Sequence, residues 1–336
     1  MADRFIELAH GNGGRLTREL IDGLFVRHLK NPQLDTQVDA AAVDLAFDGG
    51  NILVTTDGFT VQPLEYPGGN IGSLAVHGTV NDLAVAGAEP KALTVNALIE
   101  EGLEITLLER LVASMGDAAR ACGVSIVAGD TKVLRRGEGG GVYFCTTGLG
   151  IRPAGLEPGL HRISPGDRVL VSGPVGNHGT AVLLAREEFG LYGDLVSDEA
   201  SVLPFTRALL DLNGLKFMRD PTRGGLATVM HEIVDATGLG LRLREGDIPL
   251  CDEVRSVCAL LGYEPWYLAC EGRVVAVVSP EDAGEALARW RSVPGGEHAQ
   301  LIGELRESPS SVILETAIGG ERFLEELEDD PLPRIC

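Results

Sequence analysis

The sequence has few cations for its length, and this deficit sets the first limit on function. Across 336 residues, 28 Lys and Arg stand against 49 Asp and Glu, which gives a net charge of −21. Proteins that bind nucleic acid without sequence preference, or an anionic membrane, need a cationic surface, so both classes are disfavoured. Aromatic residues are also scarce at 5%, whereas the 44 glycines indicate many tight turns or close approaches of the backbone.

The sequence also has no uncharged apolar run of the roughly 18 residues that a membrane span requires. Its first residues, MADRFIELAHGNGG, contain no basic region followed by an apolar stretch, so we expect no secretory signal. None of the six cysteines forms a C-x-x-C pair, and a chain of this size does not depend on a disulfide framework. These absences predict a protein of a reducing compartment, the cytoplasm.

Strand-like and helix-like segments alternate along the chain, which predicts two domains with α/β or α+β layers. Ser73 is the expected N-cap of one helix, and Gly87 is its expected C′ residue. A loop rich in Pro and Gly over 152–166 marks the expected domain boundary. The patterns indicate helices over 14–29, 73–86, about 105–115, 179–189, 200–212, 226–237 and 281–291, and strands over 52–56, 92–99, 124–129, 142–150, 167–173 and 273–279.

Five acidic residues stand beside or within these elements. Each one alone is better explained as a turn or cap residue, except Asp82, because a carboxylate within an apolar helix needs a partner. Together, converging carboxylates with few nearby cations would suit a hard divalent ion such as Mg²⁺. The five are Asp57 and Asp130 at predicted strand ends, Asp82 within a helix, Asp220 before a helix, and Glu271 before a buried strand.

Glycine-rich stretches precede two of the predicted helices. Gly11, Asn12, Gly13 and Gly14 lead into the first, and Arg223, Gly224 and Gly225 lead into a later one. Helix N-termini expose free N–H groups that suit phosphate, although simple turns explain many such glycine pairs. There is neither a Walker A motif nor a dinucleotide-binding G-x-G-x-x-G. With the carboxylates, these stretches favour a polyphosphate–Mg²⁺ site.

The final residue, Cys336, follows an acidic segment that carries Pro331 and Pro333. An exposed thiol is a liability unless it is used, and Arg334 would favour its thiolate. Chance is the alternative explanation, since any residue can be last. The position is not a prenylation box, because that requires Cys fourth from the end.

These residues, read together, resemble the HypE family of hydrogenase maturation proteins, the carbamoyl dehydratases. The shorter motifs are shared with a wider superfamily that includes aminoimidazole ribonucleotide synthetase, selenophosphate synthetase and thiamine-monophosphate kinase, and the PRIC terminus points to HypE among them. The matching stretches are HGNGG (10–14), TTDGF (55–59), PGGNIGSLAVHGTVNDLAVAGAEP (67–90), EEGL (100–103), AGDTKVLRRG (128–137), SGPVGNHG (172–179), DPTRGGLATVMHE (220–232) and PRIC (333–336).

The resemblance implies a two-domain PurM-like fold with α/β and α+β domains and a flexible C-terminal tail. Residues 1–35 would form a Gly-rich segment and helix, and 36–152 an N-terminal α/β domain for nucleotide binding and dimerisation. Residues 165–315 would form the C-terminal α+β domain, and 320–336 a mobile tail that ends in the carrier cysteine. ATP would lie between the domains, under the Gly-rich segment.

The resemblance also implies a reaction and partners. The carbamoyltransferase HypF would load a carbamoyl group onto Cys336, and ATP would drive its dehydration to a thiocyanate. The cyanide would pass to iron held by a HypC–HypD complex, and the protein would be a homodimer. Lys132 and Glu271 join Cys336 as catalytic candidates: Lys132 would neutralise the transferred phosphoryl group, and Glu271 would remove a proton or contact the metal. The proposed nucleotide ligands are Gly11, Asn12, Gly13, Gly14, Asp57, Asp82, Asp130, Lys132, Asp220, Arg223, Gly224 and Gly225, with Asp57, Asp82, Asp220 and Asp44 for Mg²⁺.

Two residues depart from the family pattern: Cys270 stands where relatives are expected to have Asn, and Asn177 stands where some have Asp. Two other functions remain open from sequence. One is a superfamily kinase or amidine-forming synthetase that acts on a free small molecule and does not need Cys336. The other is a non-catalytic scaffold that presents Cys336 and binds nucleotide as a regulator. Selenophosphate synthetase is disfavoured, because the N-terminal glycine-rich segment has no Cys.

Overall fold

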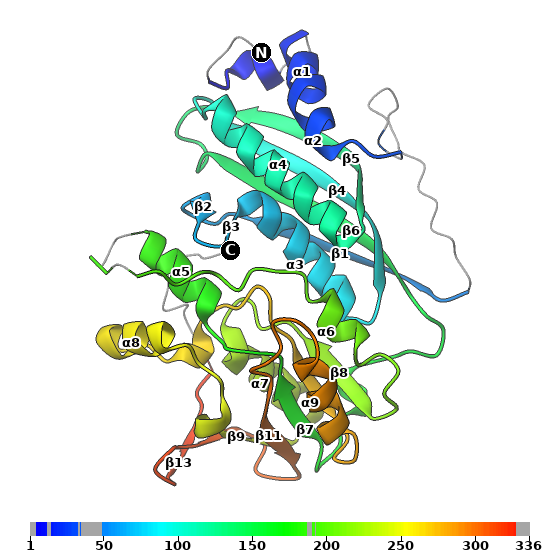
Figure 1. Ribbon diagram of the computed structural model, residues 1–336, viewed down its shortest axis with the longest axis vertical. Helices are drawn as coiled ribbons and strands as arrows, with labels where there is room; N and C mark the ends of the chain where they lie inside the picture. Colours follow the sequence, from blue (N-terminus) through cyan, green and yellow to red (C-terminus); the bar gives the residue numbers. More distant parts are fainter. Residues whose placement is uncertain are drawn as a thin grey trace. The chain divides into compact units, whose positions relative to one another are not determined.

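The computed structural model describes residues 5–11, 15–32, 34, 49–186, 190–191 and 193–326 (Figure 1). The chain divides into two compact units, the first covering most of the chain up to Ala154 and the second most of the chain from Gly155. Each unit has its own sheet. Within the described ranges, no helix combines the length and apolar composition that a membrane crossing would require.

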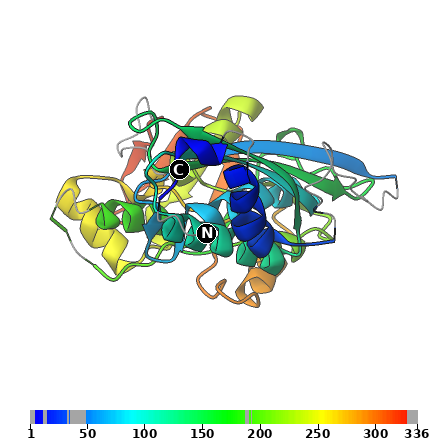
Figure 2. The same cartoon turned by 90° about the horizontal axis from the view of Figure 1, so that it is seen from above.

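The first unit is built on a four-stranded sheet in the order β1-β6-β4-β5. Only β4 and β5 are parallel, and the other neighbouring pairs are antiparallel. Helices α3 and α4 lie on one face of this sheet (Figure 1, Figure 2). The elements are β1 (Asn51–Phe59), β2 (Glu65–Tyr66), β3 (Gly69–Asn70), α3 (Ile71–Val85), β4 (Glu89–Glu100), α4 (Ile105–Cys122), β5 (Ser125–Leu134) and β6 (Val142–Arg152).

Helix α3 begins two residues earlier than the sequence predicts. The side chain of Asn70 accepts hydrogen bonds from the backbone N–H groups of Gly72 (2.8 Å) and Ser73 (3.2 Å). Asn70 therefore caps the helix, and the prediction that Ser73 is the N-cap was wrong. Ser73 lies within the first turn, where its hydroxyl oxygen accepts from the N–H of Asn70. Gly87 has φ +78°, as expected of a C′ residue.

The strands extend further than the apolar runs that predicted them. Asp57 and Asp130 lie inside β1 and β5, so the prediction that they end strands was wrong. Pairing with neighbouring strands extends both elements beyond their apolar residues, with Asp57 opposite Thr146 and Asp130 opposite Asn96. Tertiary hydrogen bonding here overrides local β propensity.

Side chains alternate between the two faces of the first sheet. Val142, Phe144 and Thr146 of β6 are buried on the face toward the helices, whereas Tyr143, Cys145 and Thr147 are only half-buried. We call this second, more exposed face the open face. On β1 it carries Ile52 and Val54, whose side chains are 48% and 63% exposed.

The N-terminal helical region, predicted as one helix over 14–29, is interrupted. It consists of α1 (Arg15–Leu20), a π-helical stretch (Ile21–Val26) and α2 (Arg27–Leu29), after a 3₁₀ turn at Leu8–Gly11. Gly23 and the β-branched residues around it weaken a regular α-helix, which is consistent with the wider turn.

The second unit contains a seven-stranded sheet in the order β13-β12-β9-β11-β7-β10-β8. Only β12 and β9 run parallel. Its strands are β7 (Arg168–Val171), β8 (Leu215–Arg219), β9 (Gly240–Arg244), β10 (Val275–Val278), β11 (Gln300–Arg306), β12 (Val312–Glu315) and β13 (Glu321–Phe323). Its helices are α5 (Asn177–Ala185), α6 (Leu203–Arg207), α7 (Gly225–Thr237), α8 (Asp252–Leu261) and α9 (Ala283–Arg291), with short 3₁₀ turns at Leu160–Arg162, Glu245–Asp247 and Pro265–Tyr267.

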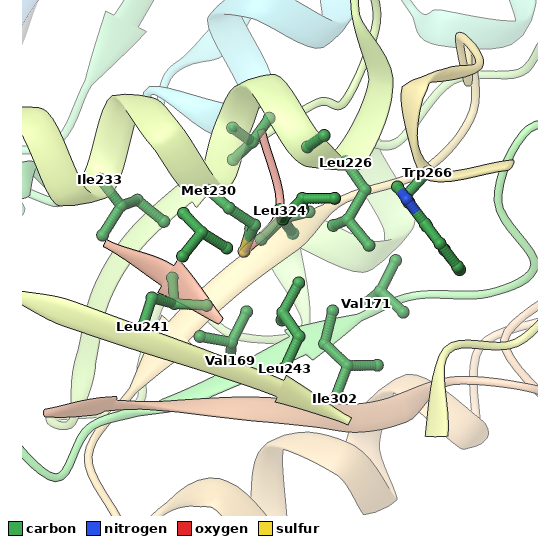
Figure 3. Close-up of a cluster of buried hydrophobic side chains, with 14 of the residues drawn as sticks. Val169, Val171, Leu226, Met230, Ile233, Leu241, Leu243, Trp266, Ile302 and Leu324 are labelled. Atoms are coloured by element: carbon green, nitrogen blue, oxygen red, sulfur yellow. The ribbon is translucent and has the colours of Figure 1, made fainter. Parts of the chain in front are cut away.

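The core of the second unit lies between α7 and this sheet. Leu226, Met230 and Ile233 recur at helical spacing on one face of α7 and point toward the strands (Figure 3). Leu243 of β9 and Ile302 of β11 belong to the same cluster and point toward them from the sheet. Each such buried side chain contributes roughly 1.5–3 kcal/mol of hydrophobic stabilisation, so this cluster fixes the position at which α7 begins.

Candidate functional site

The first unit places Asp82 on α3 beside strand β1. Its neighbours in the helix, Asn81 and Leu83, are buried, and Asp82 itself is half-buried. The hydroxyl of Thr55 on β1 donates a hydrogen bond to Asp82 Oδ2 at 2.7 Å. A hydroxyl group of the adjacent strand is therefore one partner of this carboxylate, which an apolar helix alone could not satisfy.

Asp57 lies on the same face of β1 as Thr55, since residues two apart on a strand point the same way. Its Oδ1 accepts the backbone N–H of Gly58 at 2.7 Å. Residues Thr55 and Asp57 are separated by about 7 Å along the strand. The structure thus brings Asp57 and Asp82, both predicted from sequence, to the helix-covered face of one strand.

Asp130 and Lys132 lie on the opposite, open face of the first sheet. Asp130 pairs with Asn96, which in turn pairs with Cys145, and all three point to that face. Lys132 Nζ lies 3.6 Å from Asp130 Oδ2, and both side chains are well exposed, at 65% and 63%. A pair this exposed contributes little to stability, so its two charges remain available to a ligand.

In the second unit, the loop that carries Glu271 is joined to the DPTRGG segment. The backbone N–H of Cys270 donates to the carbonyl of Pro221 at 3.0 Å. The N–H of Ala200 donates to the carbonyl of Glu271 at 3.4 Å. Glu271 and Asp220 are both buried, at 3% and 7% exposure. The backbone segments that carry these two carboxylates, 51 positions apart in the sequence, are thus brought into contact.

Gly224 and Gly225 begin α7 for a structural reason. Their φ angles are +71° and +61°, a region that residues with a side chain rarely adopt. A Cβ atom on Gly225 would lie 2.6 Å from the carbonyl oxygens of Trp266 and Leu268. The glycine therefore allows the start of α7 to touch the segment that leads to Glu271. Arg223, one residue earlier, is exposed.

Asp198 is a residue of this neighbourhood that the sequence analysis missed. Its Oδ1 accepts the N–H of His178 at 2.9 Å, and its Oδ2 accepts the N–H of Gly272 at 3.3 Å. Arg273 Nε lies 3.5 Å from Oδ2, and the Asp198 side chain has no exposed surface. The surrounding sequence VSDEAS does not indicate that Asp198 is buried or bonded, because its partners are 20 or more positions away in the sequence.

The two residues that we expect to differ from the family pattern lie close to the start of α5: Asn177 is its first residue, and Cys270 contacts Gly176, which precedes it. Burial, above all, raises the pKa of the Cys270 thiol well above its ordinary value, and Cys270 Sγ accepts the N–H of Gly176 at 3.1 Å. The Cys270 sulfur thus accepts a hydrogen bond from the backbone N–H that precedes α5. Asn177 Nδ2 donates to Cys251 Sγ at 3.4 Å, and its buried Oδ1 makes no hydrogen bond with the described residues.

Five of the predicted site residues lie outside the described ranges, whereas Gly11 lies within them. Gly11 ends the first 3₁₀ turn. Within the parts of the chain that the structure describes, no three His, Cys, Asp or Glu side chains gather in a metal-binding arrangement. The predicted residues outside the described ranges are Asn12, Gly13, Gly14, Asp44 and Cys336.

Two domain families match the chain and together span most of it. Residues 37–152 match the AIR synthase related protein N-terminal domain, and residues 164–315 match the AIR synthase related protein C-terminal domain. The fold and its carboxylate-bearing segments therefore define an AIR synthase related protein, with the PurM-like fold expected from the sequence.

Full-length relatives narrow the assignment. The carbamoyl dehydratase HypE of Bradyrhizobium diazoefficiens is 43% identical over 98% of this chain and 96% of its own length. A crystal structure of the hydrogenase maturation protein HypE in complex with ATP superposes with a TM-score of 0.92 at 43% identity, covering 98% of this chain and 99% of the other. HypE in a HypE–HypF complex gives a TM-score of 0.80 at 40% identity, covering 92% and 99%. The chain belongs to the HypE family of carbamoyl dehydratases.

Proposed function

We propose that this protein is an ATP-dependent carbamoyl dehydratase that acts on its own C-terminal cysteine. It converts an S-carbamoyl group on Cys336 into a thiocyanate, the source of the cyanide ligand for the iron centre of [NiFe]-hydrogenase. The observation that carries this proposal is the 43% identity to a HypE carbamoyl dehydratase over 98% of the chain. The cysteine that the reaction requires is the last residue of the sequence.

The chemistry explains the need for ATP. The carboxamide oxygen of R–S–C(=O)NH₂ is a poor leaving group. Transfer of the γ-phosphoryl group to that oxygen turns the departing group into phosphate, and loss of both nitrogen protons completes the nitrile. The products are R–S–C≡N, ADP and phosphate, so the carbamoyl oxygen leaves on phosphate. Phosphoryl transfer of this kind depends mainly on positioning and charge neutralisation.

The residues present fit a Mg²⁺–nucleotide ligand. Carboxylate oxygens are the ligands that Mg²⁺ prefers, and they are present in Asp57 on the helix-covered face of β1 and in Asp82 on the adjacent helix α3. Mg²⁺ would neutralise phosphate charge, and ATP would supply the phosphoryl group. We propose that Asp44 and Asp220 also contribute to metal binding, and that the remaining predicted nucleotide ligands are Gly11, Asn12, Gly13, Gly14, Asp130, Lys132, Arg223, Gly224 and Gly225.

We assign Lys132 to neutralise the transferred phosphoryl group and Glu271 to accept a nitrogen proton. The ammonium group of Lys132 is exposed, with one carboxylate 3.6 Å away. Glu271 is buried, and the contacts of Cys270 and Gly272 hold its backbone on both sides. A proton acceptor has to be held in position, and this arrangement supports that role.

Partners follow from the same proposal. HypF, which a solved complex pairs with a HypE protein, would load the carbamoyl group, and a HypC–HypD complex would receive the cyanide. The β1 edge of the open face would form a homodimer interface, because Ile52 and Val54 expose apolar surface there, whereas Asp130 and Lys132 lie on β5 at the opposite edge of the sheet. We propose that 36–152 is the nucleotide-binding and dimerisation domain and 165–315 the C-terminal domain of a cytoplasmic protein. Of the tail expected over 320–336, residues 321–324 belong to the second unit instead, because β13 pairs with β12 and Leu324 is buried.

The mass of the intact protein tests the function. After incubation with carbamoyl phosphate and its transferase, Cys336 should gain one carbamoyl group. Addition of Mg²⁺–ATP should then remove one water. Glu271→Gln and Lys132→Met should load normally and fail in the second step, whereas Glu253→Gln and Lys91→Met, which change residues away from these segments, should complete both. Loss of ATP with a free metabolite while Cys336 stays unmodified would instead favour a small-molecule kinase or synthetase.

A further inference from the structure

The last described residues of the chain, 321–326, are fastened to the second unit. Strand β13 closes one edge of the seven-stranded sheet through pairing with β12. Directly after it, the Leu324 side chain enters the hydrophobic core at 2% exposure, where it lies near Met230 (Figure 3). The backbone N–H of Leu324 donates to the carbonyl of Val312 at 2.9 Å. The residues that lead to Cys336 therefore follow a segment that is attached to the sheet and core of the second unit.

Arg322 makes a second attachment through an ionic and aromatic contact. Its Nη2 lies 2.5 Å from Glu264 Oε1, and its guanidinium carbon lies 5.6 Å from the centre of the Trp266 ring. The indole N–H of Trp266 donates to the other oxygen of Glu264 at 2.8 Å. The three side chains form a closed set in which each contacts the other two, and the cation–π geometry lies within the favourable range.

Tyr267 makes the third attachment. Its hydroxyl donates to the carbonyl oxygen of Glu325 at 2.7 Å. Burial, with the nearby Glu264 carboxylate, raises the pKa of this phenol above its ordinary value of 10. The hydroxyl therefore stays protonated, and remains a donor, throughout the neutral and mildly alkaline range.

The attachment point belongs to the segment that carries the proposed proton acceptor. Residues 264–267 lead directly into 268–272, and Glu271 follows Tyr267 by four positions. A hydrogen bond from Cys270 N–H to the Pro221 carbonyl holds this segment to the DPTRGG turn. The root of the tail and the Glu271 loop thus share one short stretch of backbone.

We propose that Glu264, Trp266, Tyr267, Arg322 and Leu324 form a tail clamp, which anchors the root of the carrier tail next to the Glu271 loop. The clamp raises the effective concentration of the loaded cysteine at its own active site. This role rests on the proposed dehydratase function. From Glu325 to Cys336 the tether has 11 residues, a reach of at most about 40 Å when extended.

The double variant Arg322→Gln/Tyr267→Phe tests the clamp without emptying the core. Arg306→Gln/Tyr263→Phe is the matched control, because Arg306 pairs with Glu304 on the same sheet and Tyr263 immediately precedes the clamp residue Glu264 in the sequence. Without these two attachments β13 and Leu324 detach more readily, and full release of the strand back to Glu315 lengthens the tether from 11 to 21 residues. Because effective concentration falls with about the −3/2 power of length, single-turnover dehydration should slow about two- to threefold.

Three further measurements distinguish an effect of the clamp on the tether from a direct effect of the substituted residues on the active site. Hydrogen exchange at residues 321–326 should accelerate in the double variant only, and loading by the transferase should not change. Insertion of ten Gly and Ser residues after Glu326 in the wild-type chain should produce the same two- to threefold loss with the clamp intact. An S-carbamoylated peptide of residues 327–336, added to full-length chains that carry Cys336→Ala, should be dehydrated equally with and without the clamp substitutions.

An unchanged single-turnover rate despite faster exchange at 321–326 would overturn the clamp. An equal loss with the free peptide would also overturn it, because the substituted residues would then act on the site and not through the tether. Failure of the proposed function has a different result: the wild-type chain itself would show no ATP-dependent loss of water from its loaded cysteine.

Discussion

Asp198 Oδ2 lies 3.5 Å from Arg273 Nε, and the Asp198 side chain is completely buried. The same carboxylate accepts the N–H groups of His178 and Gly272, so one side chain ties the start of α5 to the Glu271 loop. Two charges are withdrawn from water here, and such a pair is tolerated when hydrogen bonds satisfy the remaining lone pairs. Asp198 therefore holds the backbone at Gly272, the residue that follows the proposed proton acceptor Glu271.

Asp198→Ala should lower the free energy of unfolding by about 3–5 kcal/mol, because the buried N–H groups of His178 and Gly272 would lose their acceptor and the half-buried Arg273 its ion-pair partner. Asp198→Asn preserves the shape but turns an N–H group toward the donors of Gly272 and Arg273, so a loss of about 1–3 kcal/mol is expected. Urea unfolding measures both. Asp211→Asn, which removes a carboxylate from an exposed pair with Arg289, should stay near wild type. Equal stability of all three variants would contradict the supporting role.

Thr55→Val should weaken Mg²⁺–ATP binding about tenfold. Valine matches threonine in shape but lacks the hydroxyl that donates to Asp82 at 2.7 Å. A hydrogen bond to a charged group is worth about 1.5 kcal/mol, close to one order of magnitude in affinity. Calorimetric titration gives the dissociation constant. Thr106→Val, on the exposed side of α4, is the control, and identical affinities in the two variants would remove Asp82 from the nucleotide site.

Gly225→Ala should destabilise the second unit and slow dehydration together. The added Cβ would meet two carbonyl oxygens at 2.6 Å, and alanine disfavours φ +61°. The strain falls on the segment that leads to Glu271, so we expect a loss of roughly 1–3 kcal/mol in stability. Gly246→Ala is the comparison, since no atom lies within 4 Å of its added Cβ. A Gly225→Ala protein with wild-type melting temperature but reduced ATP binding would show that the glycine serves the ligand instead.

Helices α4 and α7 could be predicted because their apolar residues recur at helical spacing along continuous segments. The grouping of Asp220 with Glu271 could not, since it depends on a hydrogen bond between Cys270 and Pro221, which are far apart in sequence. Asp198 was missed for the same reason. The error at Ser73 was local: both Asn70 and Ser73 are good caps, and only the backbone shows which one precedes the first helical turn.

The sequence also did not predict that Asp57 and Lys132 lie on opposite faces of the first sheet. Alternation assigns faces only when strand register is known, and register comes from pairing across the sheet. The register of β1 with β6, of β6 with β4 and of β4 with β5 places Asp57 on the helix-covered face and Asp130 and Lys132 on the open face. Sequence motifs identified the candidate residues, and long-range pairing determined which of them share a face.

The buried thiols should resist modification under native conditions. Burial raises the pKa of Cys258 to about 11 and that of Cys270 well above its ordinary value, so both stay protonated near neutrality. Because only a thiolate reacts readily, neither residue should take iodoacetamide at pH 8 until the protein is unfolded. Peptide mass spectrometry reads the labelled sites. Native labelling of either residue would contradict its burial and would complicate the assignment of carbamoyl to Cys336.

The raised pKa of Cys258 also predicts a stability change at alkaline pH. The folded state favours the neutral thiol, so the contribution is full below the ordinary pKa of 9 and is lost as pH rises toward about 11. The loss should approach about 2–3 kcal/mol, which Cys258→Ala should abolish. Val257→Ala truncates a neighbouring buried side chain without a titrating group, so it should lower stability and keep the wild-type pH profile between 9 and 11.

Val54→Asp should dissociate the proposed homodimer. Val54 is 63% exposed on the open face of the first sheet, where Ile52 is 48% exposed, and a carboxylate placed in an apolar interface would have to be desolvated without a partner. Sedimentation velocity should show a shift to monomer at micromolar concentration. Ile318→Asp introduces the same charge at a side chain that is 97% exposed in the second unit, so it should leave the mass unchanged. A Val54→Asp protein that sediments as wild type would place the interface elsewhere, and a shift in Ile318→Asp alone would move it to the second unit.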